Sequence, residues 1–515
     1  MILSWVDVGV VGTYLAALVA LGLAASRRRA SAGEYFLASR GASWPTIGLA
    51  LFGSNVSPGT LIGVTGSAYA LGISVYNYDW MATVVLVVFA LLFLPQLLAM
   101  RIYTMPEYFE RRYDVRARLW LASLSVLLYV LLDAAGALYC TGLLLEALVP
   151  GLGMRATVPA LAALAAFYAL TGGLRSVMRT QALQALIMLG SAVLLAIFSF
   201  EKAGGLQAVL RANPPSHLDL ILPASDPYMP WTGLLFGAPV LAFYYWCTNQ
   251  VMVQRTLAAR SLADGQRGAL LAGFLKLLTL FVIVSPGLAG RVLYPHLRTG
   301  DQIYLRLARS LLPPGLLGLF VAAFLGSLMA ALSATYNSAA TVISMDFIRR
   351  SRPRMSERRV VGWGRVATAL CMLASAAWVP QIARFPSLWQ YFQAVLAYFT
   401  APIAALFLGG ILWPRANARG AFAALIVGGG LGALLFGLSL LGIAHVQFLV
   451  AAAIDFAVSL AVLVLLSLSG SRSAARESVL QADALGERLL GAARDVRWAA
   501  LALIALTATI VVKFW

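Results

Sequence analysis

The chain has 515 residues, of which 61% are hydrophobic and only 11% are charged. A soluble protein of this length needs far more polar surface, so the composition predicts an integral membrane protein. The net charge of +18 does not indicate nucleic-acid binding, because the basic residues lie in short loops between apolar segments rather than on one basic face.

Apolar segments of spanning length predict about fourteen transmembrane helices, and the expected fold class is therefore an all-α integral membrane protein. The predicted helices lie at 4–25, 43–70, 75–99, 117–149, 156–173, 178–201, 229–254, 265–294, 315–347, 360–381, 385–412, 418–441, 446–468 and 496–514. The segment 1–30 supplies one helix before two five-helix sets at 43–201 and 229–412, and 413–515 supplies three more. Because five is an odd number, the two sets are expected to have opposite orientations in the membrane.

Most of the 38 basic residues lie in alternate loops, which the positive-inside rule assigns to the cytoplasm. This assignment predicts a multi-pass protein of the cell membrane, in contact with the lipid bilayer, with both termini extracytoplasmic. The run FIRRSRPRMSERR at 347–359 is interpreted as a solvated cytoplasmic loop. The segment 469–495 is expected to be a cytoplasmic linker that contains a short surface helix.

The predicted helix 43–70 is interrupted by the residues GSNVSPGT at 53–60. Glycine and proline disfavour a continuous helix, and serine, asparagine and threonine offer hydrogen bonds to the freed backbone. Non-helical backbone at membrane depth occurs only where protein or a water-filled cavity surrounds it. We therefore expect this break to form the floor of a transporter's binding site. A proline kink in an ordinary structural helix is the alternative.

A second irregular helix is predicted at Gly237-Ala238-Pro239, in the first helix of the second set. The aromatic cluster FYYW at 243–246 follows it and has the size of a stacking platform or a gate, although packing against other helices is equally expected. Matched interruptions in two inverted halves are the sequence pattern of a transporter site.

Ionisable side chains inside a membrane are costly and usually face a cavity or a partner. The predicted spans contain four of them, namely Asp79, Asp133, Lys276 and Asp455. The alternative for each acid is a buried contact between helices, which is the favoured interpretation for Asp455 in a late helix. Lys276 is expected to pair with an acid or to approach the site, and its partner is left open.

No nucleophile–base pair, phosphate-binding loop or metal-ligand spacing is visible in the sequence. The three cysteines lie in apolar segments and are interpreted as small buried hydrophobes: Cys140, Cys247 and Cys371. We therefore expect no enzymatic activity and no cofactor.

Several segments between about 30 and 425 resemble, in order, those of the solute:sodium symporter family, which includes the sodium–glucose cotransporters. They are EYFLASRGASWPTIGLALFGSNVS, YTMPEYFERRYD, YALTGGLRSVMRTQALQ, NQVMVQRTLAARSLADGQRG, NSAATVISMDFIRR and FTAPIAALFLGGILWPRANARGAFAAL. The resemblance implies a LeuT-type core of two inverted five-helix repeats with broken first helices, which carries a small organic solute by alternating access.

The resemblance also implies a substrate site. Its expected residues are Thr60, Tyr78, Asp79, Tyr245, Lys276 and Gln393, with Tyr245 and Trp246 as the gate. Two positions depart from the sugar-transporting branch, because Thr60 replaces a glutamine and Ala242 replaces an asparagine. Each lost hydrogen-bonding group typically costs about 1–3 kcal/mol, so a smaller or less hydroxylated solute than glucose is expected.

The sodium site implied by the family is degenerate in this chain. The carbonyl positions are Gly53, Val56 and Ser327, but alanine occupies both positions of the two hydroxyl ligands, and glutamine occupies that of a supporting aspartate: Ala330, Ala331 and Gln181. Methyl groups cannot replace the hydration shell of sodium. We therefore predict sodium-independent transport, either facilitative or coupled to protons, with Asp79 or Asp133 as the proton carrier. The alternatives are a conventional sodium symporter with a shifted ion site and a membrane sensor derived from a transporter.

Overall fold

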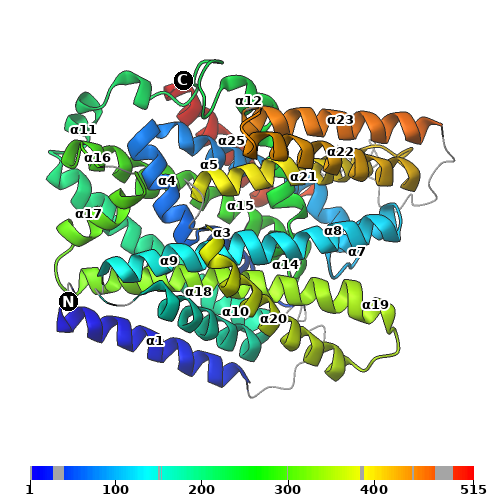
Figure 1. Ribbon diagram of the computed structural model, residues 1–515, viewed down its shortest axis with the longest axis horizontal. Helices are drawn as coiled ribbons and strands as arrows, with labels where there is room; N and C mark the ends of the chain where they lie inside the picture. The colour runs from blue at the N-terminus through cyan, green and yellow to red at the C-terminus, as the bar shows by residue number, and fades with distance from the viewer. Residues whose placement is uncertain are drawn as a thin grey trace.

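The computed structural model describes residues 3–26, 37, 40–148, 151, 153–297, 300–382, 388–443, 446–469 and 491–514. Across these residues the regular elements are helices, and β pairing is limited to two isolated bridges, Ala42 with Ala259 and Leu222 with Pro230. The predicted all-α fold is therefore confirmed (Figure 1). Most of the predicted linker 469–495 lies outside the described residues.

The N-terminal half ends with α10, and η denotes a short 3-10 or π turn. Its elements are α1 (Trp5–Ser26), α3 (Trp44–Asn55), α4 (Pro58–Leu71), η2 (Ile73–Tyr76), α5 (Asn77–Val88), η3 (Phe89–Phe93), α6 (Leu94–Ala99), α7 (Met105–Arg112), α8 (Val115–Leu128), η4 (Tyr129–Ala134), α9 (Ala135–Leu148) and α10 (Met154–Lys202). The C-terminal half begins after it. Its elements are α11 (Leu206–Ala212), η5 (Pro215–His217), α12 (Trp231–Phe236), α13 (Ala238–Phe243), η6 (Tyr244–Thr248), α14 (Gln250–Leu257), α15 (Leu262–Thr279), η7 (Leu280–Val284), α16 (Ser285–Leu293), η8 (Gly300–Gln302), α17 (Ile303–Leu311), α18 (Leu316–Val342), η9 (Ile343–Ile348), α19 (Arg349–Ser351), α20 (Glu357–Ile382), α21 (Leu388–Leu412), α22 (Ala418–Leu440), α23 (Phe448–Leu468) and α25 (Arg494–Lys513).

Among the described residues, ten helices are long and apolar enough to cross a membrane, or eleven if the bent pair α3–α4 counts as one span. Two further apolar helical stretches among the described residues are Trp5–Ala17 in α1 and Met154–Ala165 in α10. The predicted segment 229–254 is divided among four short elements.

Helix α10 is 49 residues long and contains both segments that the sequence predicts as separate spans, 156–173 and 178–201. The predicted boundary between them is therefore wrong. A glycine in a helix costs only about 1 kcal/mol relative to alanine, and the pair Gly172-Gly173 does not end this helix.

The predicted break in the first helix of the first set is confirmed. Helices α3 and α4 are bent by 64° relative to each other. Val56 and Ser57 leave the helical conformation, and the Ser57 hydroxyl accepts a hydrogen bond from the Thr60 backbone N–H at 3.3 Å, which caps α4. Pro58 then begins α4, where its missing N–H has no cost.

The second irregular helix is more complex than its sequence indicates. Gly237 separates α12 from α13 but keeps a right-handed helical conformation. A β-carbon at this position would stand 1.8 Å from the Leu449 carbonyl oxygen, so only glycine fits here. The extended residue is Asn249, which lies between the π turn η6 and α14. The full break therefore lies twelve residues after the predicted Gly237.

Helix α18 is the most enclosed spanning helix and packs against α10, α3, α20 and α1. Helices α22 and α23 lie side by side along one edge of the molecule, and α1 lies along another (Figure 1). Helices α22, α23 and α25 expose most of their surface, which is apolar and suits contact with lipid.

Candidate functional site

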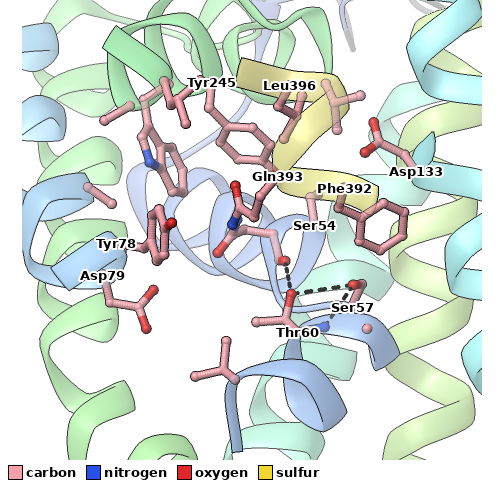
Figure 2. Close-up of a pocket in the computed structure, with 18 of the residues that line it drawn as sticks. Ser54, Ser57, Thr60, Tyr78, Asp79, Asp133, Tyr245, Phe392, Gln393 and Leu396 are labelled. Carbon is pink, nitrogen blue, oxygen red and sulfur yellow. Dashed lines mark hydrogen bonds between the residues drawn. The ribbon is translucent and has the colours of Figure 1, made fainter. Parts of the chain in front are cut away.

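A cavity of about 200 Å³ lies beside the break between α3 and α4. A cavity that holds one water molecule needs only about 10–15 Å³, so this cavity has room for a small organic solute. Its lining includes Ser54, Ser57, Gly59, Thr60, Tyr78, Asp79, Leu132, Asp133, Ala242, Tyr245, Trp246, Val251, Lys276, Ala331, Thr335, Phe392, Gln393 and Leu396. Figure 2 shows Gln393 in the middle of this cavity, with Tyr78 and Asp79 on one side and Asp133 on the other.

All six residues expected from the sequence to bind substrate line this one cavity, although five different elements of the chain carry them. Thr60 lies in the first turn of α4, where its hydroxyl donates to the Asn55 carbonyl at 3.1 Å. Gln393 comes from α21 and is 8% exposed. Both predicted gate residues, Tyr245 and Trp246, also line the cavity.

Asp79 lies in the first turn of α5 and forms an ion pair with Lys276 of α15. Both side chains are almost fully buried. The Thr279 hydroxyl donates a second hydrogen bond to the Asp79 carboxylate at 2.8 Å. The sequence left the partner of Lys276 open and gave no role to Thr279, which lies one turn after the lysine. Because the pair is neutral as a unit, this wall of the cavity offers polar atoms without a net charge.

The two predicted gate residues lie on a π turn. Tyr245 and Trp246 belong to η6, and their rings meet edge to face with centroids 5.3 Å apart. Asp133 lies on another π turn, η4, and also lines the cavity. Within the described residues, Asp133 has no hydrogen-bond or ion-pair partner. Single π turns recur at functional sites because they rotate side chains out of the regular helical register.

Phe392 and Leu396 were not predicted as site residues. Both lie in α21 and border the cavity together with Gln393. The Phe392 ring packs directly on Gly136, where a β-carbon would stand 1.9 Å from the ring. Because Phe392 is adjacent to Gln393, the sequence could have indicated that Phe392 lies near the site. It could not indicate that the ring packs on Gly136, because that glycine lies in a helix far away in the chain.

Side chains around the position that the sequence predicts to be a degenerate sodium site are joined by hydrogen bonds. The Ser54 hydroxyl donates to Gln181 Oε1 at 3.2 Å, and Gln181 Nε2 donates to the Ser333 hydroxyl at 3.4 Å. Gln181 thus connects α3, α10 and α18. The Ser327 hydroxyl donates to the Phe324 carbonyl of its own helix at 2.8 Å.

The other predicted members of this position lie nearby in the same helices. Val56 is buried at the helix break, and a β-carbon on Gly53 would stand 2.9 Å from the Gln181 carbonyl oxygen. The Ala331 methyl borders the cavity, and the backbone of Ala330 lies within α18. Among the described residues, no group of three or more histidine, cysteine or acidic side chains gathers to hold a metal.

An interrupted helix, a cavity with polar side chains at its break and a buried ion pair in the cavity wall define a membrane carrier protein. A family model described as the sodium:solute symporter family matches residues 35–428. The chain belongs to this family, whose members are transporters rather than enzymes, and it is a multi-pass membrane protein.

Several known proteins are similar to the chain over most of its length. It is 34% identical over 461 residues to sodium/glucose cotransporter 4 of Danio rerio, which covers 82% of this chain and 70% of that protein. It is 36% identical over 470 residues to a sodium/mannose cotransporter of Bos taurus, with 84% and 79% covered. It is 35% identical over 461 residues to sodium/myo-inositol cotransporter 2 of Homo sapiens, with 82% and 68% covered.

Two solved structures are similar in fold. One is a Na⁺-coupled sialic acid symporter in a substrate-bound, outward-open state, with a TM-score of 0.82, 21% identity, and coverage of 91% of this chain and 98% of that chain. The other is Mhp1, a nucleobase-cation-symport-1 family transporter, with a TM-score of 0.55, 14% identity, and coverage of 87% and 96%. These likenesses concern the fold alone, and they confirm the LeuT-type fold predicted from the sequence.

Proposed function

We propose that this chain carries a small, neutral, polar organic solute across the membrane by alternating access, and that it does so without the usual sodium site of its family. The proposal rests on one observation: all six expected substrate residues line the same cavity, at the α3–α4 break. We further propose that residues 43–201 and 229–412 are the two inverted repeats around this cavity.

The character of the solute follows from the cavity wall. The Asp79–Lys276 pair cancels its own charge, so a charged solute would gain no unpaired partner on this side. Gln393, Tyr78 and Thr60 offer hydrogen bonds suited to hydroxyl groups. The sugar and polyol cotransporters to which the chain is similar support a solute of this chemical class. The methyl of Ala242 in the lining favours fewer hydroxyl groups than glucose has.

The coupling proposal rests on the ligands available to an ion. Sodium needs several oxygen ligands, and removing its hydration shell without replacing it costs many kcal/mol. Ala331 presents a methyl group, and the amide of Gln181 already exchanges hydrogen bonds with Ser54 and Ser333. We therefore propose either facilitative transport or coupling to protons.

For proton coupling, the favoured carrier is Asp133 rather than Asp79. The sequence offered both acids. In the structure the Asp79 carboxylate is already engaged by Lys276 and by the Thr279 hydroxyl. Asp133 faces the cavity with no such partner among the described residues, so solute and proton can reach it together.

Counterflow in sodium-free medium tests this proposal against both alternatives. Purified protein is first screened by thermal shift against sugars, polyols and other small solutes. Vesicles containing the protein and an excess of the unlabelled hit, with choline replacing sodium on both sides, are then diluted into labelled solute. We expect a transient accumulation of label. Accumulation only after sodium is added would indicate a conventional symporter with a shifted ion site. Binding without counterflow in either medium would indicate a sensor.

A further inference from the structure

Three arginines surround a second hollow at the turn between α19 and α20. Arg352, Arg354 and Arg359, with Pro353 and Met355, border a space of about 370 Å³. None of these three arginines takes part in an ion pair within the described part of the chain. Arg350, in the helix just before the turn, differs because it pairs with Glu110. Three arginines therefore border one hollow whose described lining contains no acidic residue.

The turn that carries these arginines is fixed to the helices. The Met355 backbone N–H donates to the Arg352 carbonyl at 3.1 Å and closes the turn. The Met355 side chain packs against a small buried cluster formed by Met345, Val360 and Val361. The arginines are thus presented by an anchored turn, which reduces the entropy lost when they bind a ligand.

The turn lies at a membrane surface. The helical segment Leu316–Ser351 ends immediately before it and Glu357–Ile382 begins immediately after it, and both are long and apolar enough to span a bilayer. Side chains on a connection this short lie at the level of the lipid headgroups.

An apolar stripe runs along α20 from the same point. Trp363, Val366, Leu370 and Leu373 follow Arg359 at spacings of four, three, four and three residues, which places them on one helix face. Their side chains are 45%, 47%, 61% and 59% exposed. Tryptophan prefers the membrane interface, so the stripe passes from a cationic end through an interfacial ring into the hydrocarbon region.

We propose that this surface binds an anionic phospholipid, with the headgroup phosphate between Arg352, Arg354 and Arg359 and an acyl chain along the stripe on α20. Guanidinium groups match phosphate oxygens in charge and geometry, and clustered basic residues beside a span attract anionic lipids. A free phosphate ion or a soluble anion would leave the apolar stripe without a role. This site is separate from the cavity, and the proposal does not depend on the transport mechanism.

Lipid binding to the intact, purified chain tests the proposal by native mass spectrometry. The probes are phosphatidylglycerol and phosphatidylcholine with identical acyl chains, glycerophosphoglycerol, which lacks acyl chains, and inorganic phosphate. The test variant combines Arg352→Gln, Arg354→Gln and Arg359→Gln. The control variant removes three exposed positive charges from side chains that do not border the hollow, Arg358→Gln, Arg415→Gln and Arg419→Gln. Thermal unfolding shows whether each variant is folded.

We expect phosphatidylglycerol to bind the wild type and the control variant with similar affinity, and to bind the test variant at least about tenfold more weakly. Phosphatidylcholine and both water-soluble probes should bind weakly to all three proteins. If the test and control variants lose the same amount of affinity for phosphatidylglycerol, the effect is due to net charge alone and the proposed site is wrong. Equally tight binding of phosphatidylcholine, or of inorganic phosphate, would overturn the requirement for an anionic lipid.

Discussion

Asp79 and Lys276 place opposite charges side by side in a nearly water-free part of the membrane domain. Taking either charge out of water alone costs several kcal/mol, and only the partner and the Thr279 hydroxyl offset that cost. The pair therefore fixes α5 against α15 as well as lining the cavity.

The pair should behave as one unit in a double-mutant cycle. Asp79→Asn and Lys276→Met each leave a buried charge without its partner, and each should destabilise the protein by about 3–5 kcal/mol. The double variant should lose much less than the sum of the two. Chemical unfolding of purified protein measures the cycle, with the exposed Lys513→Met as a control. Additive losses would mean that the two side chains do not support each other.

Asp133 has the opposite surroundings, with a cavity in front of it and no partner within the described residues. If it carries the proton, an inward-directed proton gradient should raise solute uptake several-fold in the wild type. Asp133→Asn keeps the size of the side chain but cannot exchange a proton, so it should remove this stimulation while counterflow continues. Undiminished stimulation in Asp133→Asn would exclude Asp133 as the carrier.

The break between α3 and α4 was predictable because its cause is local. Proline, glycine and short polar residues interrupt the helix within eight positions, and the structure bends the chain there by 64°. The second interruption was only partly predictable. Gly237 indicates that the helix is interrupted near this position. The π turn η6 and the extended Asn249 depend instead on how neighbouring helices pack. A π turn has no comparable sequence signature.

Gly53 should be intolerant of a side chain because α10 lies against it. A β-carbon at this position would stand 2.9 Å from the Gln181 carbonyl oxygen and 3.1 Å from the Ala185 β-carbon. We expect Gly53→Ala to cost about 1–3 kcal/mol of stability and to reduce transport strongly. Gly190→Ala in α10 is the matched control, since a β-carbon there meets open space. Equal thermal stability and uptake in both variants would show that α3 and α10 are not in close contact.

Helix α7 is tied to the ends of two spans through Glu110. This carboxylate pairs with Arg118 and Arg350. Burial alone would raise the pKa of Glu110, but hydrogen bonds and the charges of the two arginines outweigh it and hold the pKa below its usual value. The folded protein therefore binds the Glu110 proton more weakly than the unfolded chain does, so the contribution to stability is complete above the unfolded pKa of about 4.3 and is lost as the pH falls through the lower folded pKa.

Glu110→Gln should accordingly lower stability at pH 7 by about 1 kcal/mol, and the difference from the wild type should shrink as the pH falls below about 4. Thermal unfolding of both proteins at pH 7 and at about pH 3, below the folded pKa, measures the effect. A destabilisation that is the same at both pH values would mean that the carboxylate charge has no part in the contact.

For the molecule as a whole, periodicity and composition predicted the membrane class and the position of most helices, and the family resemblance implied the residues that meet in the cavity. The sequence did not predict features that depend on the three-dimensional arrangement of the helices. The partner of Lys276, the Phe392–Gly136 contact and the continuity of α10 depend on segments far apart in the chain. The Ser54–Gln181–Ser333 connection also joins three separate helices, which single-sequence reasoning cannot align.

We propose that transport of the solute does not require a sodium ion bound at the family's usual sodium site. The most direct measurement is the initial rate of solute uptake into vesicles as sodium replaces choline at constant pH. The wild type is compared with a variant that combines Gln181→Asp, Ala330→Ser and Ala331→Ser, which supplies the missing oxygen ligands. We expect the uptake rate of the wild type to be independent of the sodium concentration, and the uptake rate of the variant to rise with sodium and then saturate. A saturable sodium requirement in the wild type would contradict this proposal.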